Sequence, residues 1–139
     1  MEDFVHLHVH TYYSILDGQS SIQRLVDKAI ANGMSGMALT DHGNMFGTKE
    51  FFNYCKKVNG KRKEEGLPEF KPIIGCEMYV ARHRKTDKVK ENGDMSGYHL
   101  IVLAKNYTGY KNLIKLVSRA WVCLLYTSPS PRDRTRSRM

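Results

Sequence analysis

The sequence predicts an α/β fold in which strands and helices alternate along the chain. Two observations indicate this class: four segments carry short apolar runs or a period of two, and the segments between and after them carry apolar residues at helical spacing. The 139 residues, 41% hydrophobic and 26% charged, suffice for one domain with a buried core. This composition excludes a disordered or fibrous protein.

The first two units of this alternation lie before residue 44. Residues 4–9 alternate apolar residues with histidines, which predicts a strand with one apolar and one histidine face. A capping-box pattern at 20–23 opens an apolar 3.6-residue period that stops near residue 33, which predicts a helix. The apolar run at 37–40 predicts a short buried strand that leads into residues 40–43.

The second half continues the pattern. A charged helix is predicted over 48–65, a third strand over 72–80, a polar mobile loop over 82–97, a fourth strand over 100–104 and a last helix whose apolar face spans 110–121. Because successive strand–helix units build parallel sheets, we expect a parallel sheet. A complete eight-stranded barrel takes roughly 250 residues, so these four units would form about half of one.

The net charge of +8 raises the question of nucleic-acid binding, but its location matters more than its size. Residues 123–139 change abruptly to Ser, Pro, Thr and Arg and hold four of the arginines. We interpret them as a disordered basic tail and assign the domain to residues 1–122. The run also looks like translated sequencing adapter, so we expect it to be an artefact and the reading frame to be cut near Val122.

Cysteine usage and the amino end indicate the compartment. The three cysteines form no C-x-x-C pair, which argues against a disulfide framework and against a structural zinc site. The start Met1-Glu2-Asp3 lacks the positive charge of a secretion signal, and no run of about 18 apolar residues occurs. We therefore expect a cytoplasmic protein without a membrane partner.

The most informative stretch for chemistry is the histidine-rich end of the first predicted strand. His8 and His10 lie two residues apart, so their side chains point the same way, about 6–7 Å apart along the backbone, and can reach one metal ion or a close pair. Alternatively, such a pair simply lines a polar face of the sheet. The pair by itself does not distinguish a metal site from a polar sheet face. His6 lies one step deeper, where a core histidine bonded to the backbone is favoured.

Further candidate groups lie in or after the other strands. Asp17 lies in the loop after the first predicted strand, and His42 ends the second. Glu77 is an acid inside an apolar strand, where a buried carboxylate costs several kcal/mol unless it is paired or bound to a metal. His99 opens its strand, so a capping or core role competes with metal binding.

These groups form a histidine and carboxylate set without a thiolate, which suits Zn²⁺, Mn²⁺ or Fe in a multinuclear hydrolytic site. Two or three ions bridged by Glu77 would activate a water and hold the oxygens of a phosphoester. The sequence thus predicts phosphoester hydrolysis, with Glu77 and His42 in catalytic roles. The predicted metal ligands are His8, His10, Asp17, His42, Glu77 and His99.

Five segments also carry a resemblance to a known family. They are His8-x-His10, Tyr13-Ser14-x-x-Asp17-Gly18, the block from Thr40 to Gly47 (TDHGNMFG), Pro72-x-x-Gly75-x-Glu77 and the stretch from Tyr98 to Asn106. In this order they resemble the polymerase-and-histidinol-phosphatase (PHP) domain at the amino end of bacterial DNA polymerase III alpha subunits. The likeness covers essentially all of residues 1–122, and the TDHGNMFG block is typical of the replicative branch.

The resemblance implies a distorted (β/α)7 barrel, of which this chain would form about the first half, with up to three divalent ions at its mouth. It also implies that the six predicted ligands hold those ions. The implied parent is a DNA-directed DNA polymerase, a nucleotidyltransferase, whose PHP domain supports polymerisation and resembles a metal-dependent 3′–5′ exonuclease. Implied partners are DNA, the other polymerase domains, and replisome subunits such as the proofreading exonuclease or the sliding clamp.

Departures from the family pattern leave two alternatives. The 139 residues contain neither the family's late D-x-H motif nor polymerase domains, so we expect the chain alone to bind metals poorly and to be inactive. A stand-alone PHP-type phosphatase acting on a small metabolite is one alternative, and the TDHGNMFG block argues against it. A purely structural interaction module is the other; the loss of His8, His42 or Glu77 would mark it, and all three are present.

Overall fold

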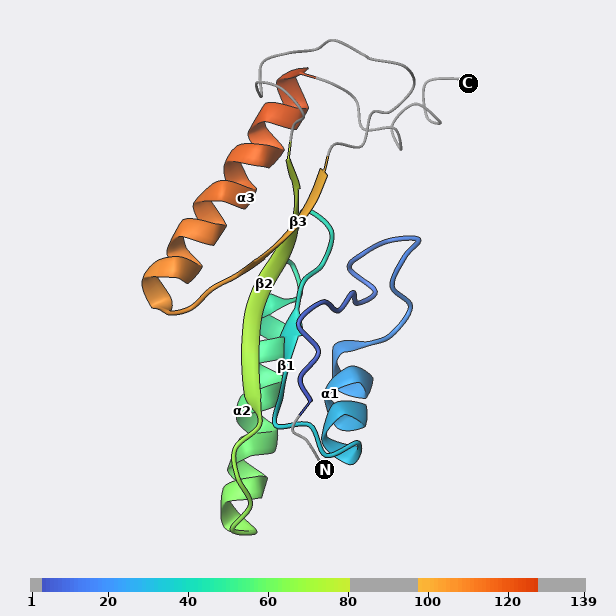
Figure 1. Cartoon of the computed structure of the whole chain (residues 1–139), viewed down its shortest axis with the longest axis vertical. Helices are drawn as coiled ribbons and strands as arrows, with labels where there is room; N and C mark the ends of the chain where they lie inside the picture. Colours follow the sequence, from blue (N-terminus) through green and yellow to red (C-terminus); the bar gives the residue numbers. More distant parts are fainter. Residues whose placement is uncertain (1–3, 81–97, 128–139) are drawn as a thin grey trace.

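The structure, a computed structural model, describes residues 4–80 and 98–127 as a mixed α/β arrangement (Figure 1). The described elements are α1 (Ile22–Ala31), β1 (Gly36–Leu39), α2 (Thr48–Glu64), β2 (Lys71–Val80), β3 (Tyr98–Leu103) and α3 (Tyr107–Thr127). Each corresponds to an element predicted from the sequence. The predicted loop at 82–97 and residues 128–139 of the predicted tail lie outside the described residues.

Among the described residues, the three named strands form one sheet in the order β1-β2-β3. β1 pairs with β2 in parallel, with Leu39 opposite Ile74, as predicted. β3 runs antiparallel to β2, with His99 opposite Tyr79, so the prediction of an all-parallel sheet is wrong here. An antiparallel neighbour needs no crossover helix, and the connection 81–97 carries no apolar helical period.

The strand predicted over residues 4–9 is not regular. The segment lies beside β1 in parallel, with one isolated bridge, His6 to Met37, and a hydrogen bond from Thr40 N to Val9 O of 2.9 Å. Val9 N donates to the Thr40 hydroxyl at 2.8 Å instead of to a backbone carbonyl, which interrupts the ladder. His6 is exposed and its ring contacts Phe4, so the predicted core role of His6 is wrong.

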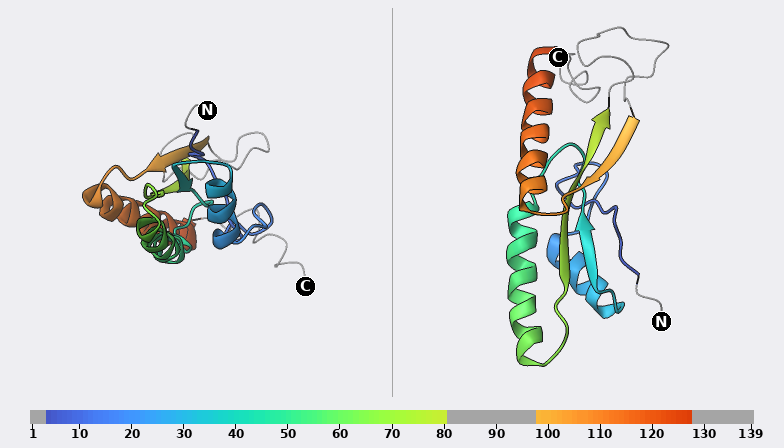
Figure 2. Two further views of the ribbon diagram at one scale, coloured as in Figure 1. Left: turned by 90° about the horizontal axis from the view of Figure 1, so that it is seen from below. Right: turned by 60° about the vertical axis from the view of Figure 1, so that its left-hand side comes forward.

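Helices α2 and α3 follow one another along the same face of the sheet (Figure 2). One buried cluster joins α1, β1 and α2 through Ile22, Val26, Ala29, Met37, Leu39, Phe51, Cys55 and Phe70. A second joins β2 to α3 through Cys76, Leu113 and Val117. Because Ile74, Cys76 and Met78 pack into these clusters, the alternation of a strand puts Glu77 on the opposite face.

The helix ends agree with the local sequence signals. The Ser21 side chain accepts a hydrogen bond from Arg24 N and caps α1, and Gly33 takes a positive φ of 77° just beyond its end. α3 continues past the predicted domain boundary at Val122 and ends at Thr127. In the part of the chain that is described, no helix combines the length and the apolar character needed to cross a membrane.

Candidate metal centre

The candidate site forms where the ends of β1 and β2 meet. Gly43 N donates to Glu77 O at 2.8 Å, and Glu77 N donates to Asp41 O at 3.1 Å, so the segment after β1 continues alongside β2. An isolated parallel bridge between His42 and Glu77 belongs to the same contact. This pairing places the His42 and Glu77 side chains side by side at the carboxyl ends of two parallel strands, where α/β folds hold their functional groups.

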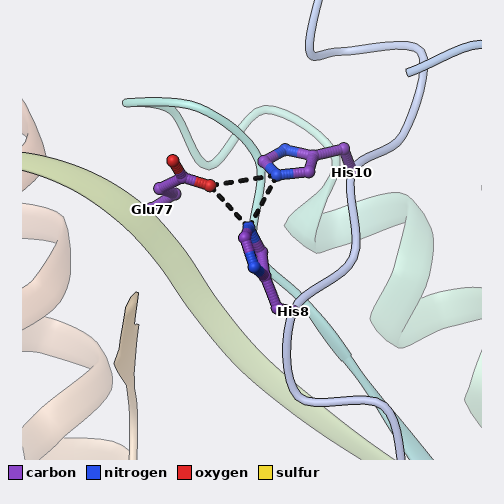
Figure 3. A group of neighbouring side chains, drawn as sticks. All are labelled: His8, His10 and Glu77. Atoms are coloured by element: carbon purple, nitrogen blue, oxygen red, sulfur yellow. Dashed lines mark hydrogen bonds and ion pairs between the residues drawn. The ribbon is translucent and has the colours of Figure 1, made fainter. Parts of the chain in front are cut away.

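Glu77 is the centre of the site, and its side chain is only 2% exposed. One carboxylate oxygen, Oε2, lies 2.6 Å from His8 Nε2 and 3.0 Å from His10 Nε2. The two Nε2 atoms are 2.8 Å apart, and Figure 3 shows both rings pointing at the carboxylate from the segment beside β1. The expected convergence of the H-x-H pair is therefore present.

The other oxygen of Glu77, Oε1, faces a second pair of imidazoles. His42 Nδ1 lies 3.4 Å from it, and His99 Nδ1 contacts it directly. His99 opens β3, which argued against a site role under the parallel prediction. Because β3 is antiparallel, its first residues lie beside the last residues of β2, and His99 reaches Glu77.

The second carboxylate of the site comes from the loop after the first segment. Asp17 contacts His42 Nε2 and is half-exposed, whereas the His42 side chain is 10% exposed. The rings of His10 and His42 stack with their centroids 4.1 Å apart. His42 therefore joins the two carboxylates, with one ring nitrogen on each.

All six predicted ligands lie in one cluster, and their roles as ligands stay a prediction. They form three overlapping groups whose donor atoms lie within 4.8 Å of one another: His8, His10 and Glu77; His10, Asp17 and His42; His42, Glu77 and His99. His10, His42 and Glu77 each belong to two groups. A set of imidazole nitrogens and carboxylate oxygens fits Zn²⁺, Mn²⁺ or Fe.

The protonation states of the buried members suit such ions. Burial by itself raises the pKa of Glu77, but the hydrogen bond with His8 and the charges of His42 and His10 outweigh it and lower that pKa below its ordinary value. Burial, followed by the charge of His42, lowers the pKa of His10. An ionised carboxylate and a neutral imidazole are the forms that bind a metal.

Sequence reasoning missed the role of Asp41, which is 1% exposed and lies outside the three groups of donor atoms. Its carboxylate accepts hydrogen bonds from Thr11 N at 2.7 Å, Thr11 Oγ1 at 2.9 Å and Ser14 Oγ at 2.6 Å. These partners are about 30 residues away in the chain, so no local pattern could have indicated them. Asp41, Thr11 and Ser14 are called the Asp41 network below.

Tyr79 was also missed. Its hydroxyl lies 3.2 Å from His42 Nδ1, and its ring meets that of His99 edge to face at 4.8 Å between centroids. A signal was available, because Tyr79 follows Glu77 by two residues in β2 and thus shares its face.

Comparison with known proteins agrees with the geometry. The family model described as "PHP domain" matches residues 6–137. The chain belongs to the PHP domain family. The resemblance seen in the sequence motifs is thereby confirmed, and its match covers nearly the whole chain.

Three relatives with high identity carry the same name. The DNA polymerase III subunit alpha of Treponema pallidum is 49% identical over 94% of this chain, and that of Borreliella burgdorferi is 44% identical over 91%. The same subunit of Thermus aquaticus is 41% identical over 91% of the chain. This chain spans 10% of the length of each of these three relatives.

Proposed function

We propose that this chain is the amino-terminal PHP part of a DNA polymerase III alpha subunit and that its histidine and carboxylate cluster hydrolyses phosphoesters with bound metal ions. The observation that carries the proposal is the convergence of four imidazoles on the two oxygens of one buried carboxylate, Glu77. The substrate class is a DNA 3′ end, from which the site would trim nucleotides.

The three groups of donor atoms support up to three ions. Zn²⁺, Mn²⁺ or Fe bound there would supply a Lewis acid and an activated water. Glu77, whose lowered pKa keeps it ionised, can contribute one oxygen to each of two ions. His42 contacts both carboxylates and can accept a proton at one ring nitrogen while it releases another from the opposite nitrogen. His8 and Asp17 are about half-exposed and form the open side of the site.

The wider assignment rests on the family and its relatives. We propose that the described elements belong to a distorted (β/α)7 barrel and that the longer protein is a replicative DNA polymerase acting in the cytoplasm. Its partners would be DNA, the remaining polymerase domains, and replisome subunits such as the proofreading exonuclease or the sliding clamp.

Metal binding by the histidine pair is tested with Mn²⁺ and the double variant His8→Ala/His10→Ala. Electron paramagnetic resonance titration should show weak but saturable Mn²⁺ binding to the unaltered chain and fewer bound ions in the double variant, which loses ligands from two of the three groups of donor atoms. The control is His6→Ala, because His6 lies on the same segment but outside the three groups of donor atoms. Equal Mn²⁺ binding by the double variant and the control would contradict the ligand assignment.

The same double substitution tests the activity in a full-length DNA polymerase III alpha subunit that carries this sequence. Removal of nucleotides from a labelled DNA 3′ end should be lost, whereas primer extension should continue, because polymerisation uses other domains. Trimming that survives in the variant would exclude this cluster as its site.

A further inference from the structure

We infer that Asp41 and Ser14 are positioning residues that hold His10 as the tautomer protonated at Nδ1, so that its Nε2 lone pair faces the metal group. The inference rests on the proposed metal site, since the lone pair matters only if an ion binds there. The side chains of Asp41 and Ser14 meet the predicted ligands only at His10 Nδ1 and His42 N, both through Ser14 Oγ.

Ser14 Oγ has one proton and three close partners. It lies 2.6 Å from Asp41 Oδ1, 3.1 Å from His42 N and 3.2 Å from His10 Nδ1. The ionised carboxylate can only accept, and the backbone N–H can only donate. The Ser14 proton therefore goes to Asp41, and the remaining lone pairs of Oγ face His42 N–H and His10. For His10 to be bonded there, its Nδ1 must carry the hydrogen.

Contacts at the far side of the His10 ring agree with this assignment. The Nε2 atoms of His8 and His10 are only 2.8 Å apart, so both cannot hold a hydrogen directed at Glu77. His8 is closer to Glu77 Oε2, at 2.6 Å against 3.0 Å for His10, and thus takes the donor role; an ion bound by His8 would displace this proton. His10 Nε2 is left as an acceptor, which is the form that binds a metal.

Asp41 holds this arrangement because its own position is determined by the same loop. Asp41 Oδ1 accepts from Thr11 N and Ser14 Oγ, and Oδ2 accepts from Thr11 Oγ1. All three residues are almost completely buried. Ser14 O accepts in turn from Asp17 N at 3.0 Å. One buried carboxylate thus orients the segments that carry His10, Asp17 and His42.

The tautomer can be measured directly in the unaltered, metal-free chain. Long-range ¹H–¹⁵N correlation spectra at a pH of about 8, where histidine is neutral, distinguish the two ring nitrogens. The expected result is a protonated Nδ1 and an unprotonated Nε2 for His10. A protonated Nε2 on His10 would overturn the inference, whatever the site does with metals.

Two variants test the consequence for metal binding. Ser14→Ala removes the acceptor of the His10 proton, and Asp41→Asn keeps the shape of the side chain but removes its charge. Both should weaken Mn²⁺ binding by about 10- to 100-fold, the usual effect of losing a group that orients a ligand, and Ser14→Ala should also admit the Nε2-protonated tautomer of His10. Ser21→Ala is the matched control, because it removes the hydroxyl that caps α1, whose contact there is with Arg24 N, and should leave Mn²⁺ affinity unchanged.

The outcomes separate this inference from the proposed function. If neither the unaltered chain nor a full-length alpha subunit that carries this sequence binds Mn²⁺, the proposed metal site is wrong, while the tautomer measurement still decides the role of Ser14. If the unaltered chain binds Mn²⁺ and both variants bind it equally tightly with the His10 proton still on Nδ1, the positioning role is wrong. Should Ser14→Ala not fold, Asp41→Asn and the spectrum of the unaltered chain remain decisive.

Discussion

At the scale of single residues, Glu77 explains why this sequence tolerates an acid inside an apolar strand. A buried carboxylate is costly without compensation, and here four imidazoles surround it. These contacts hold the side chains against one another, so the cluster is preformed. A preformed cluster loses little conformational freedom when an ion binds.

The two carboxylates should therefore contribute unequally to metal binding. Glu77 belongs to two groups of donor atoms and Asp17 to one. We expect Glu77→Gln to reduce both the number of Mn²⁺ ions bound and their affinity, by more than the roughly 10- to 100-fold that follows loss of an outer partner. Asp17→Asn should abolish binding at one group only. Isothermal titration with Mn²⁺ measures the number of bound ions and their affinity. Equal effects of the two variants would contradict the assignment of Glu77 to two groups of donor atoms.

The lowered pKa values of Glu77 and His10 predict loss of stability in acid. A group whose pKa is lower in the folded chain binds fewer protons there than when unfolded, so its contribution is present above the unfolded pKa and is lost as pH falls through the folded value. The His10 contribution to the free energy of unfolding of the metal-free chain should be lost as pH falls below about 6.5, and the Glu77 contribution only as pH falls below about 4.5. Urea unfolding in the presence of a chelator measures it.

Glu77→Gln is the control for this pH dependence. Its deficit in unfolding free energy relative to the unaltered chain should be constant from pH 7 to about 5 and shrink as pH falls below about 4.5, because protonated glutamic acid resembles glutamine. A deficit that stays constant between about pH 5 and pH 3 would show that the neighbours of Glu77 do not lower its pKa.

At the scale of elements, the loop between the first segment and α1 is as important for the site as the strands. Gly18 N donates to Ser14 O at 2.8 Å, which closes the loop that carries Asp17. A Cβ on Gly18 would lie 2.0 Å from Thr11 O, so no other residue fits without moving the backbone. The Asp41 network and this close approach together determine the path of the loop.

Two glycine substitutions should have opposite effects for this reason. Gly18→Ala should displace the loop, weaken Mn²⁺ binding and lower the midpoint of thermal unfolding. Gly60→Ala lies within α2, where a Cβ meets nothing within 4 Å, and should raise the free energy of unfolding by about 0.5–1 kcal/mol through helix propensity. Thermal unfolding measures the midpoint of Gly18→Ala, and urea unfolding measures the free energy of unfolding of Gly60→Ala. Full Mn²⁺ affinity in Gly18→Ala would show that the loop path does not matter to the site.

At the scale of the whole molecule, the antiparallel β3 changes what the cluster contains. In an all-parallel sheet, the amino end of a strand lies at the edge opposite the site. Reversal of one strand brings His99 beside Tyr79 and onto Glu77, which completes the third group of donor atoms. The direction of β3 thus decides whether His99 belongs to the set of predicted ligands.

The proposed limit of the domain at Val122 has a consequence for stability. The buried residues of α3 that pack against β2, Leu113 and Val117, precede this limit. We expect a chain that ends at Val122 to keep the thermal unfolding midpoint and the Mn²⁺ affinity of the 139-residue chain. A clear loss of stability on removing residues 123–139 would show that they belong to the folded domain.

The sequence by itself predicted most of the local structure and identified the candidate site residues. Periodicity and capping signals predicted α1, α2, β1 and β2 closely, because these features arise within a few residues. The six candidate ligands were recognisable because histidines and acids at strand ends, or inside an apolar strand, are expensive or unusual without a function.

The tertiary structure alone decided how these residues meet. The direction of β3, the irregular first segment and the exposure of His6 depend on contacts between distant parts of the chain. The Asp41 network joins residues about 30 positions apart. Hydrogen bonds between such distant residues produce no periodic pattern in the sequence, so they could not be predicted from it. Local energetics determine which elements form, whereas long-range packing determines their direction and the hydrogen bonds that orient the site.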